Sequence, residues 1–173
     1  MWKSLRLVGS DEWIKDAIEG WTLVAVTDGS YIKERYPHLC SAAFVLECSK
    51  GSGRVFGSFL VCSQGANVYR GELMGLMAIH LILLAANKVW PSLRGRVVIY
   101  SDCLGAIGRV ANLPPHHIST KCQHSDILKN IFFNCTSLSF TLDTHMLKPI
   151  RTITKNSVLY PGRRNLMYTV MTW

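Results

Sequence analysis

The chain has 173 residues, of which 49% are apolar and 17% are charged, and its formal net charge is +8 at pH 7. This length fits one hydrophobic core and is short for two, and the apolar content excludes disorder over most of the chain. The excess positive charge lies mainly in residues 144–173, which contain five basic residues and no acidic residue. The charge balance is therefore weak evidence for a nucleic-acid partner.

The most apolar stretch, residues 73–87, is 15 residues long, whereas a membrane-spanning helix needs about 20. We therefore expect a buried helix and no membrane partner. The N-terminal residues lack the apolar run of a secretory signal, so we expect an intracellular location, in the cytoplasm or nucleus. The six cysteines include no C-x-x-C pair, which favours buried free thiols over a zinc site or a disulfide framework.

Three strand-like segments come first along the chain. Residues 21–26 form an apolar, β-branched run that ends in T-D-G-S at 27–30, so a strand delivers Asp28 to its end, where a glycine turns the chain. Residues 40–47 and 54–62 are also strand-like, and they flank a segment rich in glycine and serine. That composition predicts a hairpin.

Helices and strands then alternate. Near-continuous apolar residues at 73–84 predict a buried helix that ends before Pro91, and residues 96–100 predict a strand that delivers Asp102 to its end. Helices are expected at 104–111 and 125–132, and a last strand at 138–142. This order predicts an α/β fold, with helices packed on a mixed sheet.

Three acidic residues lie at the ends of apolar elements. Asp28 and Asp102 each follow a predicted strand, and Glu72 lies in the first turn of the long helix between them. If the two strands pair at the centre of the sheet, the three carboxylates meet at one edge. Two divalent ions about 4 Å apart need several acidic ligands, because the ions repel each other. The pattern therefore fits a two-metal nuclease.

The segments T-D-G-S at 27–30, Y-R-G-E-L at 69–73 and I-Y-S-D at 99–102, in this order, resemble the three leading motifs of type-1 ribonuclease H. The long helix and the V-V-I-Y-S-D-C strand are similar to the versions fused to retroelement reverse transcriptases. The resemblance covers roughly residues 21–142. It implies a five-stranded mixed sheet in the order 3-2-1-4-5, two Mg²⁺ or Mn²⁺ ions, and hydrolysis of the RNA strand of an RNA–DNA hybrid.

The resemblance also implies roles for particular residues. Asp28, Glu72 and Asp102 would be the catalytic metal ligands. Four further residues lie where the hybrid-contacting loops of the family fall: Gly29, Ser30, Asn67 and Arg70. The preference for RNA would rest on contacts to 2′-hydroxyl groups. One departure is Leu104, where some members of the family place a polar side chain.

The family also needs a fourth carboxylate after its last strand, but this chain has no Asp or Glu beyond Asp143. Asp143 is the substitute that we expect at the end of that strand, whereas Asp126 is expected to be a helix first-turn acid. After residue 141 the chain no longer resembles the family, and truncation or a shifted reading frame would explain this. The genetic code permits a regrouping of codons 142–153 that yields histidines and paired aspartates.

These expectations divide the chain into an N-terminal extension (1–20), a ribonuclease H-like domain (21–143) and a basic, atypical tail (144–173). Three functions stay open. The first is an active hybrid endonuclease, and the second is a catalytically impaired remnant that folds and at most binds nucleic acid. The third is an unrelated α/β binding domain with coincidental acids, which requires the three carboxylates to lie far apart.

Overall fold

The computed structural model describes residues 2–112, 118–119 and 121–146. In this part of the chain, six strands form one sheet in the order β1-β4-β3-β2-β5-β6. Their bounds are β1 Arg6–Val8, β2 Leu23–Tyr31, β3 Leu39–Cys48, β4 Arg54–Cys62, β5 Arg96–Ser101 and β6 Thr141–Met146. Strands β2, β3 and β4 form an antiparallel meander, while β5 and β6 run parallel to β2. The predicted order 3-2-1-4-5 is confirmed by the five strands from β4 to β6, and β1 adds a sixth strand at the edge.

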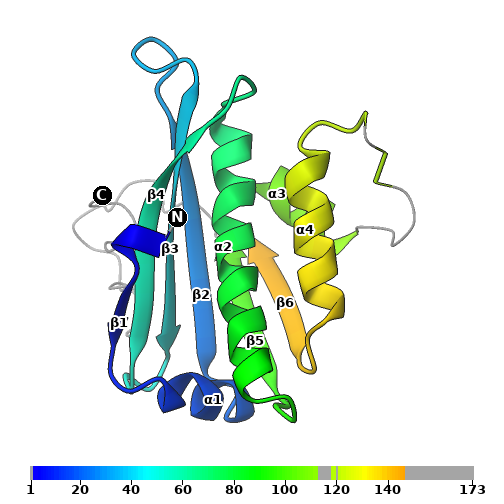
Figure 1. Ribbon diagram of the computed structural model, residues 1–173. Coiled ribbons are helices and arrows are strands. Elements are labelled where there is room, and N and C mark those ends of the chain that lie inside the picture. The colour runs from blue at the N-terminus through cyan, green and yellow to red at the C-terminus, as the bar shows by residue number, and fades with distance from the viewer. Residues whose placement is uncertain (1, 113–117, 120, 147–173) are drawn as a thin grey trace, which may run out of the picture.

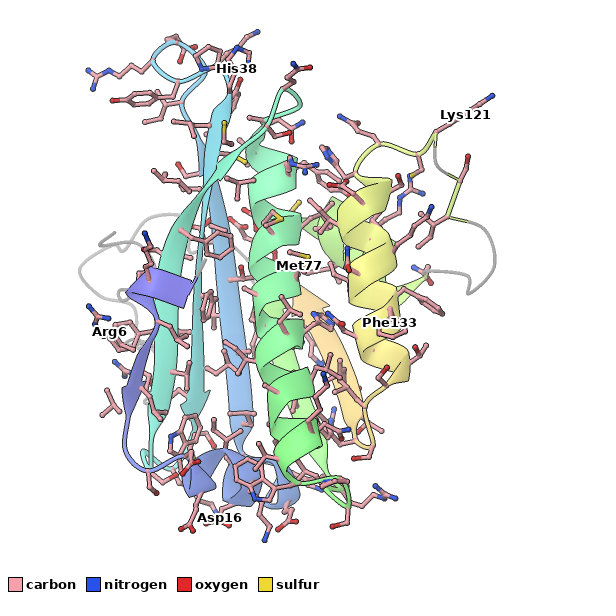
Figure 2. All side chains as sticks on the ribbon, in the orientation of Figure 1. Arg6, Asp16, His38, Met77, Lys121 and Phe133 are labelled. Carbon is pink, nitrogen blue, oxygen red and sulfur yellow. The ribbon has the colours of Figure 1, made fainter. Side chains whose placement is uncertain are left out.

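Within the described ranges, four α-helices accompany this sheet, namely α1 Glu12–Glu19, α2 Val68–Val89, α3 Leu104–Ala111 and α4 Ser125–Thr136. Helix α2 lies across one face of the sheet, and α4 runs beside it in the same direction (Figure 1). The first turns of both helices therefore lie at the end of the sheet where β2 and β5 finish. Phe133 of α4 points away from α2 (Figure 2) and is 66% exposed, while Ile127, Leu128 and Ile131 face the core.

Helix α2 is the centre of the hydrophobic core. Its buried side chains include Leu73, Leu76, Ile79 and Leu83, which pack with residues of the sheet and of α4. The helix is long and apolar enough to cross a membrane by length and composition, but half of its most apolar window is buried inside the protein. Burial by the sheet and α4 accounts for this apolar composition.

The N-terminal residues belong to the packed structure. Strand β1 pairs antiparallel with β4, and α1 buries four apolar residues on one side, Trp13, Ile14, Ala17 and Ile18. Trp13 lies directly on the backbone at Gly53, where an added Cβ would come within 2.2 Å of its ring. The segment expected as an extension thus caps the lower end of the sheet (Figure 1).

The last strand begins later than predicted, at Thr141 and not at residue 138. The Asn87 side chain near the end of α2 explains the difference. Its Oδ1 accepts hydrogen bonds from the backbone N–H and the hydroxyl of Ser139, and its Nδ2 donates to the carbonyl of Ser137. Residues 137–139 are thereby held in a turn, and the strand continues to Met146, three residues into the predicted tail. Residues 147–173 of that tail lie outside the described residues.

Candidate metal centre

Two of the acidic residues are placed by the pairing of β2 with β5. These strands are parallel, and the last registered pair joins Val26 to Tyr100. Asp28 and Asp102 each follow two residues later, so they reach the same level of the sheet. The expectation that a glycine turns the chain after Asp28 is wrong, because β2 continues to Tyr31 paired with β3, and only its pairing with β5 ends at Val26. Because parallel strands end at a common edge, residues far apart in the sequence can supply side chains to one point.

The third acid comes from α2, which lies unusually close to the sheet at its first turn. A Cβ on Gly29 would lie 2.4 Å from the backbone nitrogen of Glu72, and a Cβ on Gly71 would lie 2.6 Å from the carbonyl oxygen of Ser41. Side chains at either position would separate helix from sheet. The two glycines therefore permit the contact that brings Glu72 to β2.

The three carboxylates form one cluster. Asp28, Glu72 and Asp102 each offer one oxygen atom, and these atoms lie within 4.8 Å of one another. Glu72 is only 2% exposed. Its Oε1 accepts a hydrogen bond of 2.7 Å from the backbone N–H of Gly29, and its Oε2 accepts one of 3.3 Å from the hydroxyl of Ser101. This proximity excludes the alternative in which the three acids are scattered over the fold.

Burial and mutual repulsion disfavour the state in which all three carboxylates are ionised and no cation is bound. Burial raises the pKa of Glu72 to about 7; the Gly29 N–H opposes this, and the negative charges of Asp102 and Asp28 add to it. Burial also raises the pKa of Asp28, with a further rise from Asp102. A bound cation would relieve both effects, because it favours the ionised carboxylates.

The donor set fits a hard divalent cation. All three side chains offer carboxylate oxygens, the ligands that Mg²⁺ and Mn²⁺ prefer. Asp102 is exposed and Asp28 is half-buried, so the cluster opens to solvent on the side of the two aspartates. The arrangement could therefore hold a cation and present it to a substrate outside the protein.

Asp143 does not join this cluster in the described part of the chain. It lies inside β6 and pairs with Val98, four residues before Asp102 on β5. At about 3.3 Å per residue, this offset is about 13 Å along the strands. Its carboxylate forms an ion pair with Arg96. The expectation that Asp143 ends the strand is wrong, because β6 extends to Met146. Its role as a fourth ligand stays a prediction, and the ion pair with Arg96 holds its side chain away from the cluster.

The residues that the resemblance places at hybrid-contacting loops have different environments. Gly29 donates to Glu72, and Ser30 is exposed on β2. Asn67 caps α2, since its side chain accepts a hydrogen bond of 2.7 Å from the backbone N–H of Arg70. The Arg70 guanidinium, in contrast, forms an ion pair of 2.7 Å with Asp126 of α4. Ser30 is the most exposed of the four, while Gly29, Asn67 and Arg70 are partly buried.

Two residues, Ser101 and Asp126, were not predicted from the sequence to support the acidic cluster. Ser101 is fully buried beside the cluster, donating to Glu72 and accepting from the backbone N–H of Cys103. A hydroxyl residue directly before a strand-end aspartate was the available signal. Asp126 was assigned only to its own helix, and nothing in its spacing indicates that it reaches Arg70.

Comparisons with known proteins identify the class of fold. No family model matches the sequence, and a search of curated proteins found no match. Solved structures do match, and they share the mixed sheet with helices packed on it. The chain therefore has a ribonuclease H-like fold that carries an acidic cluster at the edge of its sheet.

The individual matches are at low sequence identity. LC11-RNase H1, solved in complex with an RNA/DNA hybrid, is 11% identical with a TM-score of 0.59, over 73% of this chain and 86% of that chain. The RNase H domain of PFV is 14% identical with a TM-score of 0.56, over 87% and 93%. RNase H1 from Halobacterium salinarum NRC-1 is 13% identical with a TM-score of 0.50, over 73% and 86%. Likeness at this level shows the fold alone.

Proposed function

We propose that this protein is a metal-dependent endonuclease that hydrolyses the RNA strand of RNA–DNA hybrids. The observation that carries the proposal is the convergence of Asp28, Glu72 and Asp102 within 4.8 Å at the end of the central parallel strands. The fold supports it, because two solved neighbours, LC11-RNase H1 and a foamy viral protease-reverse transcriptase, were determined with RNA/DNA hybrids.

In this proposal the chain supplies a rigid acidic cradle. Glu72 is held from two sides by Gly29 and Ser101, so its carboxylate has a fixed orientation. Asp28 and Asp102 complete the ligand set on the open side. When bound, two divalent ions would supply an activated water and stabilise the leaving 3′ oxygen. The protein's part is to orient its ligands and the substrate backbone around that point.

Substrate recognition is assigned to the surface beside the cluster. Ser30 lies two residues after Asp28 on β2 and is exposed, so its hydroxyl is available to the RNA strand. The hairpin that joins β2 to β3 extends beyond the sheet at this same end, with His38 near its tip (Figure 2). Contacts to 2′-hydroxyl groups would give the preference for RNA over DNA.

The test is cleavage of an end-labelled RNA–DNA hybrid by the purified chain in Mg²⁺ or Mn²⁺. We expect internal cuts in the RNA strand that disappear with EDTA and in the Asp28→Asn variant. Asp16→Asn is the matched control, because Asp16 is an exposed aspartate on α1, remote from the cluster. Absence of cleavage by a folded wild-type chain in both metals would overturn the catalytic proposal.

A second candidate is a catalytically impaired remnant that folds and at most binds nucleic acid. The ion pair between Asp143 and Arg96 favours it, since this pair removes the only acid late in the chain from the cluster. Saturable hybrid binding without cleavage is its expected result. Losing a ligand weakens a metal site and misplaces the attacking water, so this outcome is compatible with an intact fold.

The origin of the chain is part of the same proposal. We infer descent from a domain fused to a reverse transcriptase, acting inside the cell, and a shifted reading frame after about residue 141. The foamy viral neighbours support the first point. The nucleotide sequence tests the second: codons 142–153 that cannot be regrouped into the expected histidines and aspartates would contradict it.

A further inference from the structure

The first turns of α2 and α4 are joined by one charged contact. Arg70 of α2 donates from Nη2 to Oδ2 of Asp126 at 2.7 Å and from Nη1 to Oδ1 at 3.4 Å. Both guanidinium ends thus face one carboxylate, the forked geometry that gives Arg–carboxylate pairs their directional strength. Arg70 lies two residues before Glu72 in the same turn of helix.

His124 also contacts the guanidinium of Arg70. Its Nδ1 lies 3.2 Å from Nη1 of Arg70, and its ring packs against the Tyr69 ring with centroids 5.5 Å apart. The residue is buried and has a left-handed backbone (φ 61°) directly before α4. A nitrogen that faces an arginine must act as the acceptor, so the neutral ring is the form that fits.

The arginine has little capacity left for a phosphate. Its side chain is 16% exposed, and both terminal nitrogens face Asp126. Its Nε has no hydrogen-bond partner among the described residues but is buried away from solvent. A cation in the first turn of a helix is also opposed by the helix dipole. Helix stability therefore does not explain an arginine at this position, whereas the ion pair with α4 does.

The first turn of α2 is fixed on its other sides by contacts that already surround Glu72. Gly29 of β2 presses on the backbone at Glu72, and Gly71 lies against the carbonyl of Ser41 on β3. The contact with Asp126 holds the remaining side. Without it, the turn that carries Glu72 keeps its contacts with the sheet but loses its charged contact with α4, and apolar and ring packing alone remain on that side.

We propose that Arg70, Asp126 and His124 form an interhelical clamp that positions Glu72 in the acidic cluster, so that Arg70 is a positioning residue and not a nucleic-acid contact. This inference rests on the metal-binding role given to the cluster above. It reassigns an arginine that motif likeness places at the substrate, and it gives Asp126 a function beyond its own helix.

Calorimetry tests the clamp. It measures the Mn²⁺ affinity of the full chain and of its Arg70→Gln and Asp126→Asn variants. Positioning predicts that both variants lose Mn²⁺ affinity, each by about tenfold, as expected when a residue that orients a metal ligand is replaced. The double variant should lose no more than either single variant, because the pair acts as a unit.

Charge effects without positioning predict a different pattern. Removing the positive charge of Arg70 would raise Mn²⁺ affinity, while removing the negative charge of Asp126 would lower it. Opposite signs for the two variants would therefore overturn the clamp. Arg70→Lys separates the cases again: it keeps the charge and loses the fork, so positioning predicts weaker Mn²⁺ binding and charge alone predicts no change.

A last experiment measures the affinity of the protein for an RNA–DNA hybrid in EDTA, where no metal is bound. The clamp predicts that Arg70→Gln leaves the affinity for the hybrid and its salt dependence unchanged. Arg6→Gln is the matched charge control, because Arg6 is exposed on the edge strand β1. A phosphate contact predicts a salt slope reduced by about one, which would overturn the inference. A folded wild-type chain that binds no Mn²⁺ would overturn the proposed function itself, whereas equal Mn²⁺ affinity in wild type and variants would overturn the clamp alone.

Discussion

Asp102 and Asp143 lie on neighbouring parallel strands, yet their surroundings are opposite. Asp102 is exposed beyond the end of β5, with two other carboxylates near it and no ion pair among the described residues. Asp143 lies within β6 and is neutralised by Arg96 of the adjacent strand. A strand-borne aspartate becomes a candidate ligand only when the register brings it to the common edge and no cation already satisfies it. Four predictions test that contrast.

The largest difference is expected in catalysis. Asp102→Asn should reduce metal-dependent hybrid cleavage on the order of a thousandfold, because it removes a ligand from a site that contributes several kcal/mol to the reaction. Asp143→Asn should leave the cleavage rate within about twofold, since its carboxylate is paired elsewhere. Initial rates on a labelled hybrid measure both. Equal losses in the two variants would break the contrast and place Asp143 in the active site.

The next effect comes from the contact between β2 and α2. Gly29→Ala places a Cβ 2.4 Å from the Glu72 nitrogen, and the forced separation should cost about 1–3 kcal/mol of unfolding free energy. It should also weaken Mn²⁺ binding, because Glu72 moves with the helix. Urea denaturation and calorimetry give the two values. Gly65→Ala is the control, since its nearest neighbour would be the Ser63 hydroxyl at 3.8 Å.

A smaller effect is expected from the charge on Glu72. Its folded pKa of about 7 exceeds the ordinary value of 4.5, so the metal-free folded state binds more protons than the unfolded state between these values. Stability from this group is complete below about pH 4.5 and is lost as pH rises through about 7. Glu72→Gln should thus stabilise the metal-free protein at pH 8 by about 1–2 kcal/mol.

Urea denaturation in EDTA at pH 5 and pH 8 measures this difference, which should be small at the lower pH and larger at the higher one. Glu34→Gln serves as the control, because Glu34 is exposed on the β2–β3 hairpin. A variant that is less stable than the wild type at pH 8 would show that the ionised carboxylate is favourably held even without a cation.

The smallest effect belongs to the Asp143–Arg96 ion pair. Both side chains are partly exposed, at 35% and 43%, and ion pairs of this kind contribute about 0–1 kcal/mol. Asp143→Asn should therefore change the unfolding free energy by less than about 1 kcal/mol and leave Mn²⁺ affinity unchanged. Denaturation in low and high salt measures the first quantity. A loss of Mn²⁺ affinity would mean that the carboxylate exchanges between Arg96 and the cluster.

The sequence was sufficient for features that depend on local pattern. Alternation and glycine-rich turns indicated the meander. The positions of Asp28 and Asp102 after apolar runs indicated a shared edge, although Asp28 lies within β2, which continues to Tyr31. What failed required tertiary contacts. Asn87 decides where β6 begins, and Arg96 decides the state of Asp143, yet each acts on residues about 50 positions away. Residues 6–8 are too few to predict as a strand without β4 beside them.

The parallel pairing of β2 with β5 also has a consequence for how the chain folds. The meander of β2, β3 and β4 involves neighbours in sequence, but the cluster needs β2 to pair with β5, more than 70 residues later. Closing so long a loop is slow compared with forming a hairpin. Cation uptake during refolding would therefore report the moment at which the parallel half of the sheet docks, after the antiparallel half has formed.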